Sequence, residues 1–147
     1  NISPPPLPTT PNHQPTGSAD YLHTFHNQHN CVAYYNIDAF IKIFYNALKP
    51  CGVLGVVEHR AKPDSKLKQS SDSGYMTEAF VIKHALMAGF TLDTKSEINA
   101  NSKDTKDYSK GVWTLPPTLT EGETDRAKYL AIGESDRMTL RFLKPAK

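Results

Sequence analysis

The spacing of apolar positions predicts two helices and one buried strand in the middle of the chain. Over residues 37–48 apolar side chains recur at steps of three and four, the pattern of a helix with one buried face. A nearly continuous apolar run predicts a strand over residues 53–58 that is covered on both faces in a parallel sheet. The second helix is expected over Glu78–Ala88, where Thr77 can cap its start and Gly89 can end it.

Three more strands complete the predicted order. The first is expected over Ala19–Phe25 from its apolar side chains, another over residues 91–98 from its position, and the last over residues 138–143 from its alternating pattern. A long excursion over residues 99–136, with a helical turn at residues 126–130, separates the last two strands. Strands that alternate with helices indicate an α/β fold with a mostly parallel sheet, and we expect the final strand to be antiparallel.

Residues 1–18 are predicted to lie outside this sheet. Six prolines in this stretch prevent sustained helix or sheet hydrogen bonding. We interpret the segment as a leader or linker that enters the folded domain, residues 19–147, with a proline-motif ligand as the alternative.

Composition and charge exclude several kinds of partner. The 147 residues suffice for one domain, and the formal charge of +2 is spread without the dense basic block that nucleic-acid binding needs. No apolar run approaches the roughly 20 residues that span a bilayer, and no targeting segment is visible, so we expect no membrane partner and assign no compartment. Cys31 and Cys51 fall at opposite ends of neighbouring strands, roughly 15–20 Å apart, and are expected to be free thiols.

Polar side chains cluster where two neighbouring strands end. The clusters are Asn27, His29 and Asn30 after the first strand, and Glu58, His59 and Arg60 at the end of the second. Because the carboxyl ends of parallel strands share the edge at which open α/β sheets bind ligands, both clusters are candidate site residues. His29 or His59 is a candidate general base and Arg60 a candidate anchor for an anionic substrate. The alternative is that these side chains only cap strand ends.

A metal site is the rival interpretation of the first cluster. The potential ligands are His23, His26, His29 and Cys31. Their spacing does not match the paired ligands of zinc sites, and His23 and His29 are not held on one face once the strand becomes a loop. We therefore expect no metal.

Several sequence blocks resemble a known family. The stretch of residues 48–54, LKPCGVL, resembles the "LKPGG" turn that precedes the fifth strand of class I S-adenosylmethionine-dependent methyltransferases. Further blocks are TFHNQHN (residues 24–30), GVLGVVEHRAKP (52–63), GYMTEAFVI (74–82), KSEINANSKDTKDY (95–108), GVWTLPP (111–117) and DRAKYLAIGESDRM (125–138). Together they resemble one family of predicted bacterial methyltransferases over nearly all of residues 19–147.

This resemblance implies a Rossmann-like sheet of seven strands, of which the chain matches the fourth to the seventh, the C-terminal half. In that family a glycine-rich turn after the first strand and an acidic residue after the second hold S-adenosylmethionine. No Gly-x-Gly-x-Gly follows a strand here, and Gly52 and Gly55 flank and interrupt a strand instead. We therefore expect an incomplete domain that binds S-adenosylmethionine only if the missing half is supplied, and whose methyl acceptor is unknown. A non-catalytic remnant or interaction module is the alternative.

The resemblance also implies roles for individual residues. His26, Asn27 and Asn30 would touch the methionine end of the cofactor. The substrate end would be formed by Glu58, Tyr108, Trp113 and Arg137, three of them in or beside the long excursion. The alternative is that Trp113 forms a packed surface flap with Pro116 and Pro117. The chain departs from the family pattern at His26, Gln28 and Cys31, where "FRNWHNW" has arginine and tryptophans, at Cys51, where a glycine is usual, and at Glu58, where an aspartate is usual.

The first strand is predicted to lie exposed at an edge, because the resemblance places its usual neighbour outside this sequence. An unpaired edge is prone to pair with another chain. We expect a homodimer, a complementary N-terminal half, or the proline-rich leader folded back as a cover.

Overall fold

The computed structural model describes residues 16–25, 37–66 and 72–146. Four strands form one sheet in the order β1-β2-β4-β3: β1 Ala19–Phe25, β2 Leu48–His59, β3 Thr91–Ser96 and β4 Arg137–Leu143. β1 and β2 are parallel, and β4 runs antiparallel to both β2 and β3. The mostly parallel α/β sheet with a late antiparallel strand is therefore confirmed.

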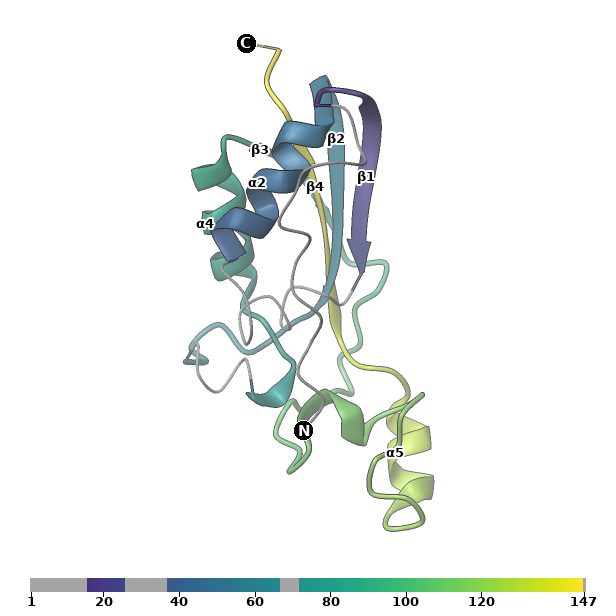
Figure 1. Cartoon of the computed structure of the whole chain (residues 1–147). Helices are drawn as coiled ribbons and strands as arrows, with labels where there is room; N and C mark the ends of the chain where they lie inside the picture. Colours follow the sequence, from purple (N-terminus) through teal and green to yellow (C-terminus); the bar gives the residue numbers. More distant parts are fainter. Residues whose placement is uncertain (1–15, 26–36, 67–71, 147) are drawn as a thin grey trace, which may run out of the picture.

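Two helices, α2 (Ile37–Ala47) and α4 (Glu78–Ala88), lie on the same side of this sheet (Figure 1). Their apolar faces join alternate residues of β2 and β4 in one core. Its members include Ile41, Leu54, Val56, Val81, Ala85, Leu140 and Phe142. The other residues of each strand point to the opposite face, where described side chains leave a shallow hollow of about 230 Å³. The period of two along β2 and β4 thus separates a covered face from an open one.

The ends of α4 follow the predicted caps. The Thr77 hydroxyl oxygen accepts a hydrogen bond from the Phe80 amide at 3.3 Å, which satisfies one free donor of the first turn. Gly89 has φ 109, and its amide donates to the carbonyls of Ala85 and Leu86. A left-handed backbone at this position favours glycine and ends the helix.

The structure moves the boundary between the first predicted helix and the strand that follows it. Extended backbone begins at Leu48, which we expected in the helix, and β2 includes the turn before residue 53. Proline disfavours helical backbone in the residue before it, so Pro50 draws Lys49 out of the helix. Within the turn Cys51 has φ 63, a conformation that favours glycine.

The remaining elements lie in the excursion. β3 ends at Ser96, two residues earlier than expected. A short 3-10 helix, η1 (Gly111–Thr114), was not predicted, and the expected helical turn is α5, Arg126–Ile132.

Among the strands of the described residues, β1 lies at one edge of the sheet and β3 at the other. Cys51 is an exposed free thiol, whereas Cys31 lies outside the described residues. In the described part of the chain no helix combines the length and apolar character needed to cross a membrane.

Candidate functional site at the carboxyl edge of the sheet

The parallel strands β1, β2 and β3 end at one edge of the sheet, and β4 starts there. The excursion between β3 and β4, with η1 and α5, lies beyond this edge, at the end toward which the β1 arrow points (Figure 1). Open α/β sheets bind ligands outside the carboxyl ends of their strands. This edge is therefore the candidate site.

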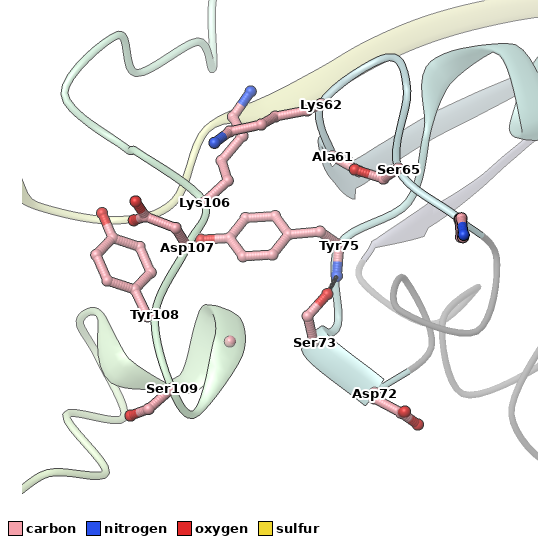
Figure 2. Close-up of a pocket in the computed structure, with 12 residues that line it drawn as sticks. Ala61, Lys62, Ser65, Asp72, Ser73, Tyr75, Lys106, Asp107, Tyr108 and Ser109 are labelled. Atoms are coloured by element: carbon pink, nitrogen blue, oxygen red, sulfur yellow. Dashed lines mark hydrogen bonds between the residues drawn. The ribbon is translucent and has the colours of Figure 1, made fainter.

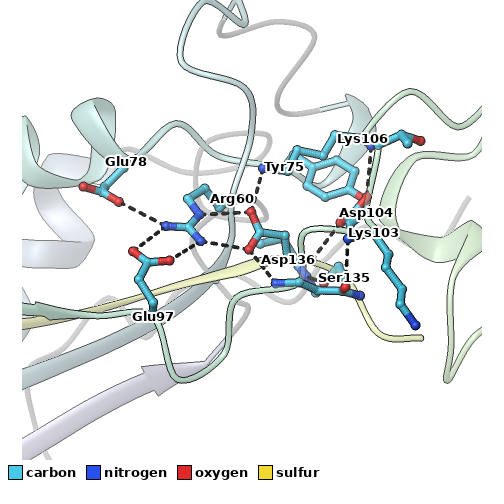
Figure 3. A network of polar contacts seen from close by, with 12 residues as sticks. Arg60, Tyr75, Glu78, Glu97, Lys103, Asp104, Lys106, Ser135 and Asp136 are labelled. Atoms are coloured by element: carbon cyan, nitrogen blue, oxygen red, sulfur yellow. Dashed lines mark hydrogen bonds and ion pairs between the residues drawn. The ribbon is translucent and has the colours of Figure 1, made fainter. Parts of the chain in front are cut away.

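Arg60, directly after β2, is the centre of a polar network (Figure 3). Its Nε and Nη2 donate to the two Asp136 oxygens at 3.0 and 2.9 Å. Its Nη1 and Nη2 donate to the two Glu97 oxygens at 2.9 and 2.7 Å. Hydrogen bonds to Glu97 and Asp136 raise the pKa of the Arg60 guanidinium above its ordinary value. Arg60 was predicted to hold an anionic substrate, but its guanidinium is bound by carboxylates of the chain itself. These contacts join β2 to the excursion and to β4.

Asp136 accepts further hydrogen bonds on the other side of this ion pair. The Lys106 ammonium donates to it at 2.6 Å and the Asn101 amide at 2.9 Å. Burial alone would raise the pKa of the Asp136 carboxyl, but the hydrogen bonds from Arg60 and Lys106 outweigh it and hold that pKa well below its usual range. The carboxylate is therefore charged and fully engaged, and it fixes the path of the excursion.

Tyr75 and Asp104 form a second, buried part of the network. The Tyr75 hydroxyl donates to both Asp104 oxygens at 3.0 Å. Asp104 also accepts from the amides of Asp136 at 2.8 Å and Lys106 at 2.9 Å. Burial and the adjacent Asp104 charge raise the pKa of the Tyr75 hydroxyl, so it is a neutral donor.

A pocket of about 620 Å³ opens beside Tyr75, between the segment after β2 and the excursion (Figure 2). Its lining is Ala61, Lys62, Ser65, Lys66, Asp72, Ser73, Tyr75, Lys106, Asp107, Tyr108, Ser109 and Gly111. Figure 2 shows the Tyr75 ring in its centre with Tyr108 to one side. Burial raises the pKa of the Tyr108 hydroxyl, which stays protonated at neutral pH. The pocket therefore offers aromatic surface, hydroxyl groups and both signs of charge to a small molecule.

His59 lies at the end of β2 beside this network. Its Nδ1 is 2.5 Å from the Ser135 hydroxyl oxygen, and its ring centroid is 6.3 Å from that of Tyr75. The antiparallel register places Arg137 opposite His59. Glu58 is fully buried on the covered face and accepts a hydrogen bond from the His59 amide at 3.0 Å.

The structure brings some of the predicted site residues together and not others. Three predicted residues lie near Tyr75 or the polar network around it: His59, Arg60 and Tyr108. Trp113, in η1, packs against Gly74, and a Cβ added to Gly74 would lie 3.2 Å from the Trp113 ring. Glu58 points away from this group. His26, Asn27, His29 and Asn30 fall outside the described residues, as do three of the four potential metal ligands.

Sequence reasoning missed the residues that complete the network. These are Tyr75, Asp104, Lys106, Ser135 and Asp136. Each lies in one of the blocks that carry the family resemblance, and those blocks, far apart in the chain, meet at this edge. Membership in these blocks was the one feature of the sequence that could have identified the five residues, because their spacing along the chain follows no recognisable pattern.

The described residues do not provide a cradle for S-adenosylmethionine. β2 and β3 are followed by Arg60 and Glu97 without a glycine-rich turn, and the segment after β1 lies outside the described residues. Gly55 serves a different purpose, because an added Cβ would lie 2.7 Å from the Tyr21 hydroxyl oxygen. Its lack of a side chain makes room for Tyr21 on the open face.

Comparisons with known proteins give a fold and no family. No family model and no curated protein matches the chain. Among solved structures, the cyclase SpnF is similar over 97% of this chain and 54% of its own, with a TM-score of 0.57 and 16% identity. An S-adenosylmethionine-dependent methyltransferase from Mesorhizobium loti is similar over 90% of this chain and 64% of its own, with a TM-score of 0.51 and 12% identity.

A third similar structure is the complex between the Haloferax volcanii Trm112 methyltransferase activator and a putative methyltransferase. The match covers 95% of this chain and 58% of that chain, with a TM-score of 0.52 and 16% identity. The chain thus spans between about half and two thirds of the length of these three proteins. It has a methyltransferase-like α/β fold.

Proposed function

We propose that the chain is the acceptor-binding part of an S-adenosylmethionine-dependent methyltransferase whose acceptor is a small molecule. The observation that carries this proposal is the pocket beside Tyr75, which opens at the carboxyl edge of a methyltransferase-like sheet. When bound, S-adenosylmethionine would supply the methyl group. The described residues do not fit this cofactor, so a complementary N-terminal half with a glycine-rich turn would have to provide its site.

The residues of this chain then act on the acceptor. Tyr108 and the pocket hydroxyls bind and orient it. Trp113 in η1 and Arg137 at the start of β4 lie at the same edge without lining the pocket. His59 is the candidate general base: it does not line the pocket, but its contact with Ser135 fixes its ring 6.3 Å from that of Tyr75, which does. We also propose His29 as an alternative base. The cofactor would be contacted by His26, Asn27 and Asn30. Glu58 supports His59 from the covered face.

Ligand-observed NMR with a library of small amines, phenols, thiols and carboxylates tests the pocket without the cofactor. We expect members that bind the chain and lose binding in the Tyr108→Ala variant. The matched control is Leu130→Ala, at an exposed side chain of α5 that does not line the pocket. Binding that Tyr108→Ala leaves unchanged would contradict the assignment of the acceptor site.

The open face of the sheet favours a second candidate function, a non-catalytic interaction module. Tyr21 and Phe25 are 56% and 52% exposed on β1, a degree of aromatic exposure that is typical of contact surfaces. The two candidates differ in what the chain should bind. Small-molecule binding that Tyr108→Ala abolishes would support the enzyme, whereas binding to another protein that Tyr21→Ala and Phe25→Ala abolish would support the module.

A further inference from the structure

Two lysines of one turn line the pocket beside Tyr75 without a counter-charge. Lys62 and Lys66 belong to the segment after β2, where the Ser65 amide donates to the Lys62 carbonyl at 3.1 Å and closes a turn. Both lysines are exposed, and within the described residues no carboxylate forms an ion pair with either. All 15 acidic residues of the chain lie among the described residues, so no other side chain supplies a carboxylate. An ammonium group without such a partner can bind an anion from outside the chain.

Lys106 adds a third ammonium group to the lining, and the chain holds this group in place. It donates to Asp136 at 2.6 Å, and 17% of its side chain is exposed. Asp136 is itself held by the Arg60 guanidinium. Because an ammonium has three donors, Lys106 can bind a ligand while Asp136 fixes its position. A group that is already fixed loses little conformational entropy on binding.

The two carboxylates of the lining do not neutralise these lysines. Figure 2 shows Asp72 on the opposite side of the Tyr75 ring from Lys62 and Lys106. Asp107 accepts a hydrogen bond from the Thr105 hydroxyl. In the part of the chain that the structure describes, neither carboxylate forms an ion pair with a lysine of the lining. The charges in the pocket are therefore separated, and Lys62 and Lys106 lie together on one side of it.

We propose that the acceptor carries an acid group, a carboxylate or a phosphate, and that this group binds between the ammonium groups of Lys62 and Lys106. The inference rests on the proposed function, because it names the acceptor class of the same pocket. Hydrogen bonds from an ammonium to an ionised oxygen are roughly twice as strong as neutral ones. Lys62 and Lys106 thus take the role that was expected of Arg60, whose guanidinium the carboxylates of Glu97 and Asp136 already bind.

Tyr108 indicates what the rest of such an acceptor contacts. Its hydroxyl oxygen accepts a hydrogen bond from the Thr105 amide at 3.1 Å, and its ring centroid is 6.0 Å from that of Tyr129 in an edge-to-face arrangement. Both contacts fix the ring at the side of a pocket of about 620 Å³, a volume typical of small-molecule sites. A fixed aromatic surface beside two ammonium groups makes aromatic acids the suitable probes.

NMR titration of the full chain with benzoate and phenyl phosphate tests the proposal, with benzamide and phenol as the neutral counterparts. Each acid should bind about tenfold more tightly than its counterpart, because it alone forms charge-assisted hydrogen bonds. The two acids also distinguish the sources of the charge. Tighter binding of benzoate would identify a carboxylate acceptor, and tighter binding of phenyl phosphate a phosphorylated one.

Substitutions at Lys62 locate the acid group. Lys62→Ala should weaken the binding of both acids by about three- to tenfold, a modest loss because the side chain is exposed. Lys62→Arg keeps the positive charge and should keep the binding. The matched control is Lys83→Ala, which removes an exposed lysine of α4 that does not line the pocket and should have no effect. The amide spectrum verifies that each variant is folded.

The outcomes separate this inference from the proposed function. Acids that do not bind at millimolar concentration, that bind no better than their neutral counterparts, or that lose no affinity in Lys62→Ala overturn the inference. Neutral ligands that bind equally well and depend on Tyr108 would also overturn it, but they would leave the acceptor pocket in place. Acid binding that depends on Lys62 and not on Tyr108 would support the acid site and contradict the role of Tyr108 in the proposed function.

Discussion

The guanidinium of Arg60 and the carboxylate of Asp136 form a two-point ion pair between the end of β2 and the start of β4, with N···O distances of 3.0 and 2.9 Å. Little of either side chain is exposed, 18% for Arg60 and 7% for Asp136. Ion pairs with so little access to water are weakly screened, and a partner left alone in such a place is costly. This contact therefore controls the geometry of the candidate site.

Asp136→Asn should lower the free energy of unfolding by about 2–4 kcal/mol, because Arg60 and Lys106 lose a shared, nearly buried counter-charge. Urea denaturation monitored by circular dichroism measures this change. The control is Glu97→Gln, which removes a mostly exposed partner of Arg60 and should cost less than about 1 kcal/mol. Equal, small effects of both substitutions would contradict a central role for Asp136.

The low pKa of Asp136 predicts that the chain is sensitive to acid. Hydrogen bonds hold this pKa below the value of about 3.9 for an unfolded aspartate. The stability it contributes is therefore present above the unfolded pKa and is lost as the pH falls through the unfolded value toward the folded one. Denaturation curves between pH 7 and pH 3 should show a steeper loss in the wild type than in Asp136→Asn. Parallel pH profiles would refute this attribution.

Cys51→Gly should stabilise the chain by about 0.5–1 kcal/mol. Cys51 has φ 63 and an exposed side chain, so glycine relieves left-handed strain with little loss of packing, less its own entropic cost. Thermal denaturation under reducing conditions measures the difference. The neighbouring Gly52→Ala should act in the opposite direction, because an added Cβ would lie 2.8 Å from the Lys49 carbonyl oxygen. A loss of stability in Cys51→Gly would contradict the strain argument.

The packing of η1 on the loop before Tyr75 depends on Gly111. An added Cβ would lie 2.2 Å from the Ser73 carbonyl oxygen, so Gly111→Ala should cost about 1–3 kcal/mol from crowding in addition to backbone strain. Gly122→Ala is the matched control, because Gly122 also has a positive φ but nothing within 4 Å of an added Cβ. The difference between the two variants in urea denaturation isolates the crowding, and no difference would refute close packing at this point.

The chain alone should not bind S-adenosylmethionine in the micromolar range. Loss of two or three multidentate contacts, at roughly 1.5–3 kcal/mol each, weakens a micromolar site to millimolar or worse. Isothermal titration of the chain with S-adenosylmethionine should therefore give no saturable heat at micromolar concentrations, with a complete methyltransferase as the positive control. Micromolar binding would show that the chain contains a cofactor site other than a glycine-rich turn.

The sequence predicted the elements well because helix and strand periods are local properties. The apolar steps before residue 48 and the alternation in β4 arise from backbone geometry within a few residues. Thr77 and Gly89 mark the ends of α4 for the same reason, since caps act over one turn. The error at Leu48 occurred where two local signals compete, an apolar position that continues the helix and a proline two residues later that opposes it.

The sequence by itself determined the α/β order and the antiparallel last strand. It also predicted polar residues where the strands end, which in the described residues holds for Glu58, His59 and Arg60 at the end of β2. Only the tertiary structure decided which of those residues meet. Arg60 is 76 positions from Asp136, and Tyr75 is 29 from Asp104, so no local period relates them. The pleat sends the side chains of Glu58 and His59 to opposite faces of the sheet. The tertiary structure decided which of these faces the helices cover, so that Glu58 is buried and His59 faces the network.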